Sequence, residues 1–158
     1  MSLGLYLHIP YCFSKCRYCD FYSHPGERGV PEAYVDALLR ELDRFAPEAP
    51  LQPDTLYFGG GTPSLLRPEQ AKRLIDAARP MPGAEITLEA NPETVTEASL
   101  AGFREAGVDR ISFGVQSARD TQLRTLGRPH SAKQARAAFA AARRAGFANI
   151  SGDLMLAL

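Results

Sequence analysis

The chain has 158 residues, 45% of them hydrophobic, and its 18 basic side chains are balanced by 18 acidic ones. This length and composition fit one globular domain with a core of its own. A chain without net charge lacks the long-range field that attracts nucleic acid or an anionic membrane, so we expect neither as a partner.

The sequence also argues against membrane insertion and secretion. No apolar run approaches the roughly 20 residues that a membrane-spanning helix requires. The N-terminus passes directly into a strand-like run, without the basic segment and apolar stretch of a secretory signal. We therefore expect a cytoplasmic protein.

Strand and helix patterns alternate from the N-terminus onward. A short apolar run predicts a strand at 5–9, and apolar residues at helical spacing predict a helix at 32–45. A second strand is predicted at 55–58, where three glycines follow it. Pro68 then suits the first turn of a second helix, whose inward face carries Ala71, Leu74, Ile75 and Ala78.

The alternation continues in the second half, with strands predicted at 85–90, at 110–115 and from 149 onward. Two helices are predicted between these strands. Thr94 or Thr96 caps the first helix, and Thr94 with Glu97 has the spacing of a capping box.

Ser131 with Gln134 has the same capping-box spacing, which predicts the start of the last helix. Residues 106–112 (AGVDRIS) and 145–151 (AGFANIS) form a weak internal repeat of a helix end, a glycine and the next strand. Regular alternation favours a parallel α/β sheet, and repetition of one unit favours a barrel. We predict a partial (βα) barrel, with a doubly wound sheet as the alternative.

Residues 1–158 would supply about four βα units and one further strand, which cannot close a barrel of eight units. Residues 154–158 read as an apolar strand with no helix after them to cover them. We therefore expect the N-terminal part of a larger core domain. Its open sheet edge would make it poorly stable or prone to self-association.

All three cysteines of the chain, Cys12, Cys16 and Cys19, lie within eight residues. An odd number of cysteines in a reducing compartment argues against a disulfide framework and in favour of a metal. The cysteines follow the first predicted strand, so they belong to the first βα loop. In a barrel this loop lies at the C-terminal face, where active sites are found.

An ordinary [4Fe–4S] cluster takes four thiolates, one per iron, so three thiolates leave one iron with an open position. An amino group and a carboxylate can chelate that iron, and the methionine end of S-adenosylmethionine offers both. An electron from the cluster would then break a carbon–sulfur bond and generate a 5′-deoxyadenosyl radical. A zinc site with His8 or His24 as the fourth ligand and three unrelated buried thiols are the alternatives.

The spacing Cys-x3-Cys-x2-Cys resembles the motif of the radical-SAM superfamily. Further runs are similar to the oxygen-independent coproporphyrinogen III oxidase family and, within it, to the heme-chaperone branch of the HemW type. These runs are 5–12 (LYLHIPYC), 19–23 (CDFYS), 57–64 (YFGGGTPS), 89–92 (EANP), 114–117 (GVQS) and 126–130 (LGRPH). The resemblance covers nearly the whole chain and implies the cluster, ligated by the three cysteines, and S-adenosylmethionine.

The glycine-rich run after the second strand lacks the features of a nucleotide-binding loop. No Gly-Lys-Ser/Thr follows it, and Ser64 stands where a dinucleotide fingerprint has its third glycine. Taken alone, it predicts only a tight loop. The family resemblance implies that Gly60, Gly61 and Thr62 meet the amino group of S-adenosylmethionine.

Three polar residues, Glu89, Gln116 and Asp153, lie in or just after successive apolar strands. Burying a carboxylate without a partner is costly, so each needs the backbone, an arginine or a ligand as its partner. The matching family positions contact the ribose hydroxyls and the methionine end of the cofactor.

The resemblance also implies that Arg128 lies near the carboxylate of the cofactor. It implies that Tyr6 and Tyr18 flank the cofactor and its adenine, although both tyrosines also fit ordinary packing positions. It assigns no catalytic residue in this part of the chain.

Phe21 marks a departure from the oxidases of the family, which carry a further cysteine two positions beyond the third ligand. The departure favours a heme chaperone that binds heme and passes it to acceptor hemoproteins. The alternatives are oxidative decarboxylation of coproporphyrinogen III and radical chemistry on another substrate. Heme or a porphyrin and an electron donor for the cluster are the further partners implied, and no heme ligand is identified among His8, His24 and His130.

Overall fold

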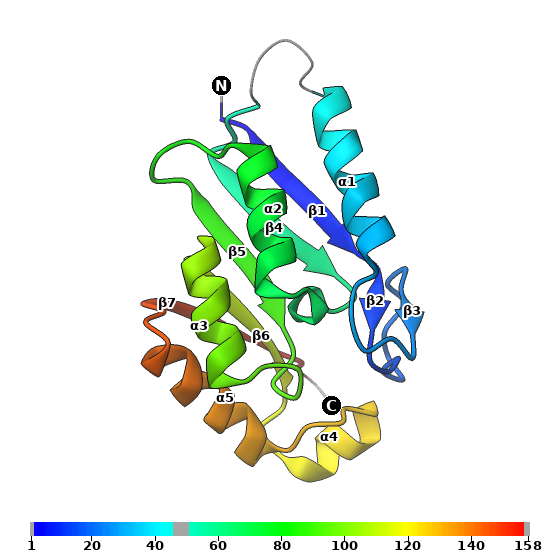
Figure 1. Cartoon of the computed structure of the whole chain (residues 1–158). Helices are drawn as coiled ribbons and strands as arrows, with labels where there is room; N and C mark the ends of the chain where they lie inside the picture. The colour runs from blue at the N-terminus through cyan, green and yellow to red at the C-terminus, as the bar shows by residue number, and fades with distance from the viewer. Residues whose placement is uncertain (1, 46–50, 157–158) are drawn as a thin grey trace.

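The computed structural model describes residues 2–45 and 51–156. Its main feature is a sheet of five parallel strands that lie side by side in chain order (Figure 1). The strands are β1 (Gly4–Ile9), β4 (Thr55–Gly60), β5 (Glu85–Ala90), β6 (Arg110–Gln116) and β7 (Asn149–Leu154).

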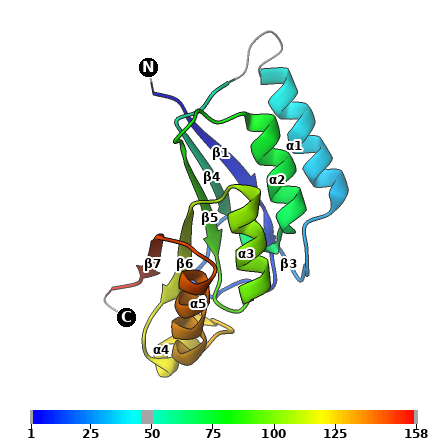
Figure 2. The ribbon, with the colours of Figure 1, turned by 60° about the vertical axis from the view of Figure 1, so that its left-hand side comes forward.

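Four helices connect these strands and cover one face of the sheet (Figures 1 and 2). They are α1 (Glu32–Phe45), α2 (Pro68–Ala78), α3 (Glu97–Ala106) and α5 (Ala132–Arg144). Parallel crossovers are right-handed in nearly all proteins, so a strand order that never reverses keeps every helix on the same face. A doubly wound sheet reverses its order and has helices on both faces. The predicted α/β fold with a partial barrel is confirmed, and the sheet is open among the described residues.

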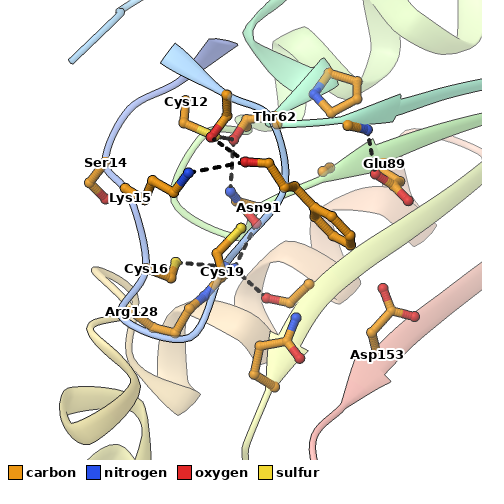
Figure 3. A pocket seen from close by; sticks show the side chains of 18 of the residues that line it. Cys12, Ser14, Lys15, Cys16, Cys19, Thr62, Glu89, Asn91, Arg128 and Asp153 are labelled. Atoms are coloured by element: carbon orange, nitrogen blue, oxygen red, sulfur yellow. Dashed lines mark hydrogen bonds between the residues drawn. The ribbon is translucent and has the colours of Figure 1, made fainter. Parts of the chain in front are cut away.

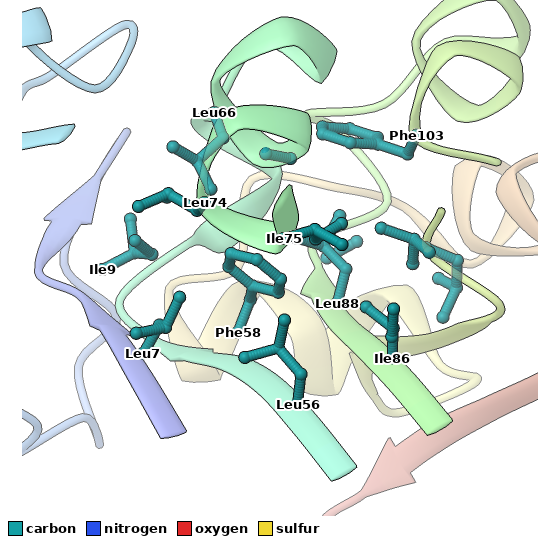
Figure 4. Packing of buried hydrophobic residues seen from close by; sticks show 14 of the residues in the cluster. Leu7, Ile9, Leu56, Phe58, Leu66, Leu74, Ile75, Ile86, Leu88 and Phe103 are labelled. Carbon is teal, nitrogen blue, oxygen red and sulfur yellow. The ribbon is translucent and has the colours of Figure 1, made fainter. Parts of the chain in front are cut away.

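The core lies between the helices and one face of the sheet (Figure 4). Alternate strand residues point toward the helices, and Phe58 and Leu88 are fully buried there against Leu74 and Phe103. Because side chains alternate along a strand, Tyr57 and Glu89 belong to the opposite face. That face is polar and forms the wall of the hollow described below.

Of the two capping boxes predicted from the sequence, the structure contains one and lacks the other. Ser131 and Gln134 form the predicted capping box, in which Gln134 N donates to Ser131 Oγ at 3.2 Å. The predicted box of Thr94 and Glu97 is wrong. Thr96 caps α3 and pairs with Ser99, while Thr94 Oγ1 donates to the carbonyl of Asn91.

The last strand is shorter than predicted. β7 ends at Leu154, which pairs with Gln116, the last residue of β6, and Met155 N donates to the carbonyl of Gln116 at 2.9 Å. Residues 157–158 of the predicted strand lie outside the described residues. The helices among the described residues are all too short or too polar to span a lipid bilayer.

Candidate functional site

A hollow of about 140 Å³ opens at the C-terminal ends of the strands, beneath the cysteine loop (Figure 3). Parallel α/β sheets place their ligand sites at this end. Every predicted site residue except Tyr6 lines it: Cys12, Cys16, Tyr18, Cys19, Gly60, Gly61, Thr62, Glu89, Gln116, Arg128 and Asp153. The sheet thus brings together residues that are up to 141 positions apart, from Cys12 to Asp153 (153 − 12).

Backbone bonds at both ends hold the cysteine loop in place. Cys12 ends the short strand β2 (Tyr11–Cys12), which pairs with β3 (His24–Pro25) and so closes the loop on itself. Farther along, Arg17 N donates to the carbonyl of Leu126 at 3.1 Å. That bond ties the loop to the end of the short helix α4 (Asp120–Leu126), which the sequence did not predict.

The glycine loop lies directly against the cysteine loop. Gly61 N donates to the carbonyl of Ile9 at 2.8 Å, and a Cβ at Gly61 would lie 2.9 Å from Cys12 Sγ. Gly60 has φ +117°, a conformation that strongly favours glycine. Thr62 Oγ1 donates to Cys12 Sγ at 3.5 Å. Only glycine permits this close approach of the two loops.

Arg128 connects the cysteine loop to the ends of two strands. Its Nη1 donates to Cys16 Sγ at 3.4 Å and to the Tyr18 hydroxyl at 3.5 Å. Its Nη2 donates to Asn91 Oδ1 and to the carbonyl of Gly114, both at 2.6 Å. One planar guanidinium thus fixes groups from three segments of the chain.

The environment keeps Arg128 charged. Burial alone would lower the pKa of its guanidinium, but the neighbouring Tyr18, Cys16 and Glu93 raise that pKa above its ordinary value. Its Nε is buried and has no hydrogen-bond partner among the described residues. A buried N–H without a partner is costly, and the carboxylate of a bound ligand would satisfy it.

Asn91 is a site residue that the sequence analysis missed. Its Nδ2 donates to Thr62 Oγ1 at 3.1 Å, while its Oδ1 accepts from Arg128. It therefore links the glycine loop to the arginine. Its position directly after β5, two residues beyond Glu89, was the available signal.

Glu89 is held by two donors on β4. Tyr57 Oη donates to its Oε1 at 2.7 Å, and Gly60 N donates to its Oε2 at 3.2 Å. Burial raises the pKa of the Glu89 carboxyl, the two hydrogen bonds lower it, and the charge of Asp153 raises it, with a net upward shift. Tyr57, also missed from the sequence, has its pKa raised by burial and by Glu89, so it stays a hydroxyl donor.

The two tyrosines expected to flank the cofactor lie in different places. Tyr18 lines the hollow beside Arg128. Tyr6 does not line it: its side chain is largely exposed, and its ring stacks on Tyr57 at 6.0 Å. Tyr57, on which Tyr6 stacks, is the residue that donates to Glu89. The contact of Tyr6 with a cofactor stays a prediction.

Gln116 and Asp153 reach the hollow from the strained end of the sheet. Gln116 has φ +67°, unusual for a residue with a side chain, and the β6–β7 register shifts between Gly114 and Gln116. Asp153 lies opposite Gly114 in β7. The irregularity redirects the chain at the point where Gln116 enters the site.

The donor set fits an iron–sulfur cluster better than zinc. Among residues 2–45 and 51–156, no three His, Cys, Asp or Glu side chains come close enough to hold one metal ion. A cluster needs only one thiolate per iron, and the three thiols line one hollow beside a cation. Both ring nitrogens of His8 lie within hydrogen-bonding distance of other groups, the Tyr6 hydroxyl and the Tyr22 carbonyl, which argues against a zinc ligand.

Residues 6–158 match the model of the Radical SAM superfamily. The chain belongs to the radical SAM superfamily. Members of this superfamily generally use a [4Fe–4S] cluster and S-adenosylmethionine, as the cysteine spacing predicted.

Two relatives show which members of the radical SAM superfamily this chain is similar to. It is 43% identical to the heme chaperone HemW of Escherichia coli K12, over 97% of this chain and 42% of that protein. It is 41% identical to the bovine radical S-adenosyl methionine domain-containing protein 1, mitochondrial, over 98% of this chain and 36% of the relative. The chain thus spans about two fifths of the length of these relatives.

A solved structure agrees with this placement. The coproporphyrinogen III oxidase HemN of Escherichia coli, described as a radical SAM enzyme, matches with a TM-score of 0.86 and 31% identity. The match covers 97% of this chain and 37% of the oxidase. The predicted resemblance to this family and to its HemW-type branch is confirmed.

Proposed function

We propose that residues 1–158 form the cluster- and S-adenosylmethionine-binding part of a HemW-type heme chaperone, which binds heme and passes it to acceptor hemoproteins. The greater identity to HemW, 43% against 31% for the HemN oxidase over the same share of the chain, supports this assignment. We place the protein in the cytoplasm, where a reducing environment keeps cysteines available as thiolates.

Phe21 is the observation that carries the choice of chaperone over oxidase. Its side chain is 70% exposed and belongs to the lining of the hollow. Lys15 Nζ donates to its carbonyl at 3.1 Å and so holds this turn of the cysteine loop. Phe21 brings an apolar ring, without thiol chemistry, to the position where the oxidases carry a cysteine.

In this proposal the cysteines supply three thiolates, and the remaining residues hold S-adenosylmethionine. When bound, the cluster and the cofactor supply one-electron chemistry at the sulfonium. The loop of Gly60 to Thr62 offers backbone groups to the amino group of the methionine end. Arg128 offers its free Nε–H to the carboxylate, and Glu89 accepts hydrogen bonds from ribose hydroxyls.

A heme-transfer assay tests the proposal. The protein is reconstituted with iron and sulfide without oxygen, loaded with heme and mixed with an apo-hemoprotein acceptor. We expect heme to appear in the acceptor, and no protoporphyrinogen to form from coproporphyrinogen III when S-adenosylmethionine and an electron donor are supplied. Formation of protoporphyrinogen would overturn the chaperone assignment.

The oxidase is the second candidate, favoured by the close structural match to HemN. The same decarboxylation assay decides it. The Phe21→Cys variant serves as a control, because it restores the thiol at the position in question. If the variant and the natural chain both remain without turnover, Phe21 is not the residue that separates the two activities.

A further inference from the structure

His130 is a buried histidine outside the lining of the hollow. Its side chain has no exposed surface, and its two ring nitrogens each lie close to one oxygen atom. Nδ1 lies 3.1 Å from Glu93 Oε2, and Nε2 lies 3.1 Å from the carbonyl oxygen of Val115. The imidazole therefore bridges the loop after β5 and the end of β6.

This geometry fixes which nitrogen carries a hydrogen. The carbonyl of Val115 can only accept, so Nε2 must donate to it. The contact between Nδ1 and the Glu93 carboxyl is satisfied by one further proton, carried by either partner. In both arrangements Val115 receives a hydrogen bond from His130, and Glu93 fixes the orientation of the ring.

Val115 precedes the strained residue of the site. Gln116 has φ +67°, and Ser117 N donates to the same Val115 carbonyl at 2.8 Å. A non-glycine residue in the left-handed region costs free energy and persists only where its surroundings hold it. The bond from His130 is one of the contacts that hold this turn.

The same loop holds the neighbouring carbonyl as well. Arg128, two residues before His130, donates from Nη2 to the carbonyl of Gly114 at 2.6 Å. The segment after α4 thus binds two successive carbonyls of β6, those of Gly114 and Val115. Arg128 and Gln116 both line the hollow, so the anchoring of this segment sets the position of two site residues.

We propose that His130, oriented by Glu93, is a positioning residue that sets Gln116 and Arg128 for S-adenosylmethionine. The proposal rests on the proposed function, because it concerns affinity for that cofactor. It assigns a role to a buried pair that no cofactor contact explains.

Two substitutions of His130 separate its two bonds. A Gln side chain places its amide nitrogen near the position of Nε2, whereas an Asn side chain reaches only the position of Nδ1. His130→Gln therefore keeps the bond to Val115, and His130→Asn loses it. Three quantities are measured: S-adenosylmethionine affinity of the reconstituted protein, amide hydrogen exchange at Ser117 and Met155 in the cofactor-free protein, and the thermal midpoint.

We expect His130→Asn to weaken cofactor affinity by about tenfold or more and His130→Gln to stay within about threefold of the natural chain. Exchange at Ser117 and Met155 should accelerate only in the Asn variant. Unchanged affinity and exchange in His130→Asn would overturn the proposal. Equal losses in both variants that follow the thermal midpoint would also overturn it, because they would show a purely structural role.

If His130→Asn does not fold, Glu93→Gln and Glu93→Ala replace it. A Gln at 93 can donate to Nδ1 of His130, so His130 Nε2 still donates to the Val115 carbonyl. Only the Glu93→Ala variant should therefore lose cofactor affinity and protection from exchange. The reverse order would overturn the proposal. If the natural chain itself does not bind S-adenosylmethionine, the proposed function fails, and the exchange comparison still decides the role of His130.

Discussion

Arg128 makes hydrogen bonds to three parts of the site: the cysteine loop, the segment after β5, and β6. Arg128→Lys keeps the charge but cannot reach these partners with one planar group. We expect a loss of S-adenosylmethionine affinity of about tenfold or more, as for the loss of a charged hydrogen bond. Isothermal titration of the reconstituted protein measures it.

The matched control is Arg124→Lys, on the exposed side of α4. This substitution should leave the affinity unchanged. An Arg128→Lys variant that binds the cofactor as tightly as the control would show that the contacts of the guanidinium are dispensable.

The raised pKa of Glu89 predicts how the stability of the cofactor-free chain depends on pH. Burial raises the pKa of its carboxyl in the folded state above the ordinary value of 4.5. Its contribution to stability is therefore complete below the ordinary value and is lost as pH rises through the raised pKa. Glu89→Gln removes this loss, so the stability of the variant relative to the natural chain should increase as pH rises across that window.

Urea unfolding at a series of pH values measures this difference. Glu105→Gln, at an exposed position on α3, is the control and should follow the natural chain. A Glu89→Gln difference that is independent of pH would contradict the assigned shift. The same variant should bind S-adenosylmethionine more weakly, because it loses a charged acceptor.

At the scale of elements, the contact between the glycine loop and the cysteine loop is the most sensitive part of the fold. In Gly61→Ala the new Cβ would lie 2.7 Å from the Tyr11 carbonyl and 2.9 Å from Cys12 Sγ. We expect destabilisation of about 1–3 kcal/mol and lower iron incorporation, because backbone cannot move aside cheaply.

Gly29→Ala is the control for this substitution, since the nearest atom to its added Cβ is 4.0 Å away. Iron content after reconstitution and denaturant unfolding are measured for both variants. Equal iron content in the two would show that the loops tolerate separation.

The elements also show what the sequence could and could not predict. Strands and long helices follow from the spacing of apolar side chains, because burial on one face imposes a period. The short pieces β2, β3 and α4 are too short for such a period to stand out, and tertiary bonds such as that of Arg17 N to the Leu126 carbonyl help to hold them.

Part of the candidate site, Glu89, Gln116 and Asp153, was predictable for a related reason, and the family resemblance supplied the rest. Parallel strands bring their C-terminal ends to one edge, so polar residues at those ends gather whatever their separation in sequence. Asn91 and Tyr57 were missed because their roles depend on partners, Arg128 and Glu89, that only the folded sheet places beside them. Tyr6 does not line the hollow, and its ring packs on Tyr57, so its contact with the cofactor stays a prediction.

For the molecule as a whole, the outer edge of β7 has no neighbouring strand among the described residues. Leu154 on this strand is 62% exposed. An exposed apolar strand edge favours pairing between molecules, so we expect a polypeptide limited to residues 1–158 to self-associate as its concentration rises. Leu154→Lys should reduce this association in analytical ultracentrifugation.

Met81→Lys is the control, because Met81 is also exposed but lies in the connection between α2 and β5 and not in an edge strand. Equal effects of the two substitutions would indicate general gains in solubility and contradict a role for the strand edge.

The cluster with an open iron position is the central claim at this scale, since the folding of the whole sheet brings residues from distant strands to the hollow beside the cysteine loop. Iron and sulfide analysis with electron paramagnetic resonance of the reduced protein, before and after addition of S-adenosylmethionine, tests it most directly. We predict about four irons per chain and a cluster signal that changes when the cofactor is added. A zinc-containing protein without iron, or a cluster signal that S-adenosylmethionine leaves unchanged, would contradict it.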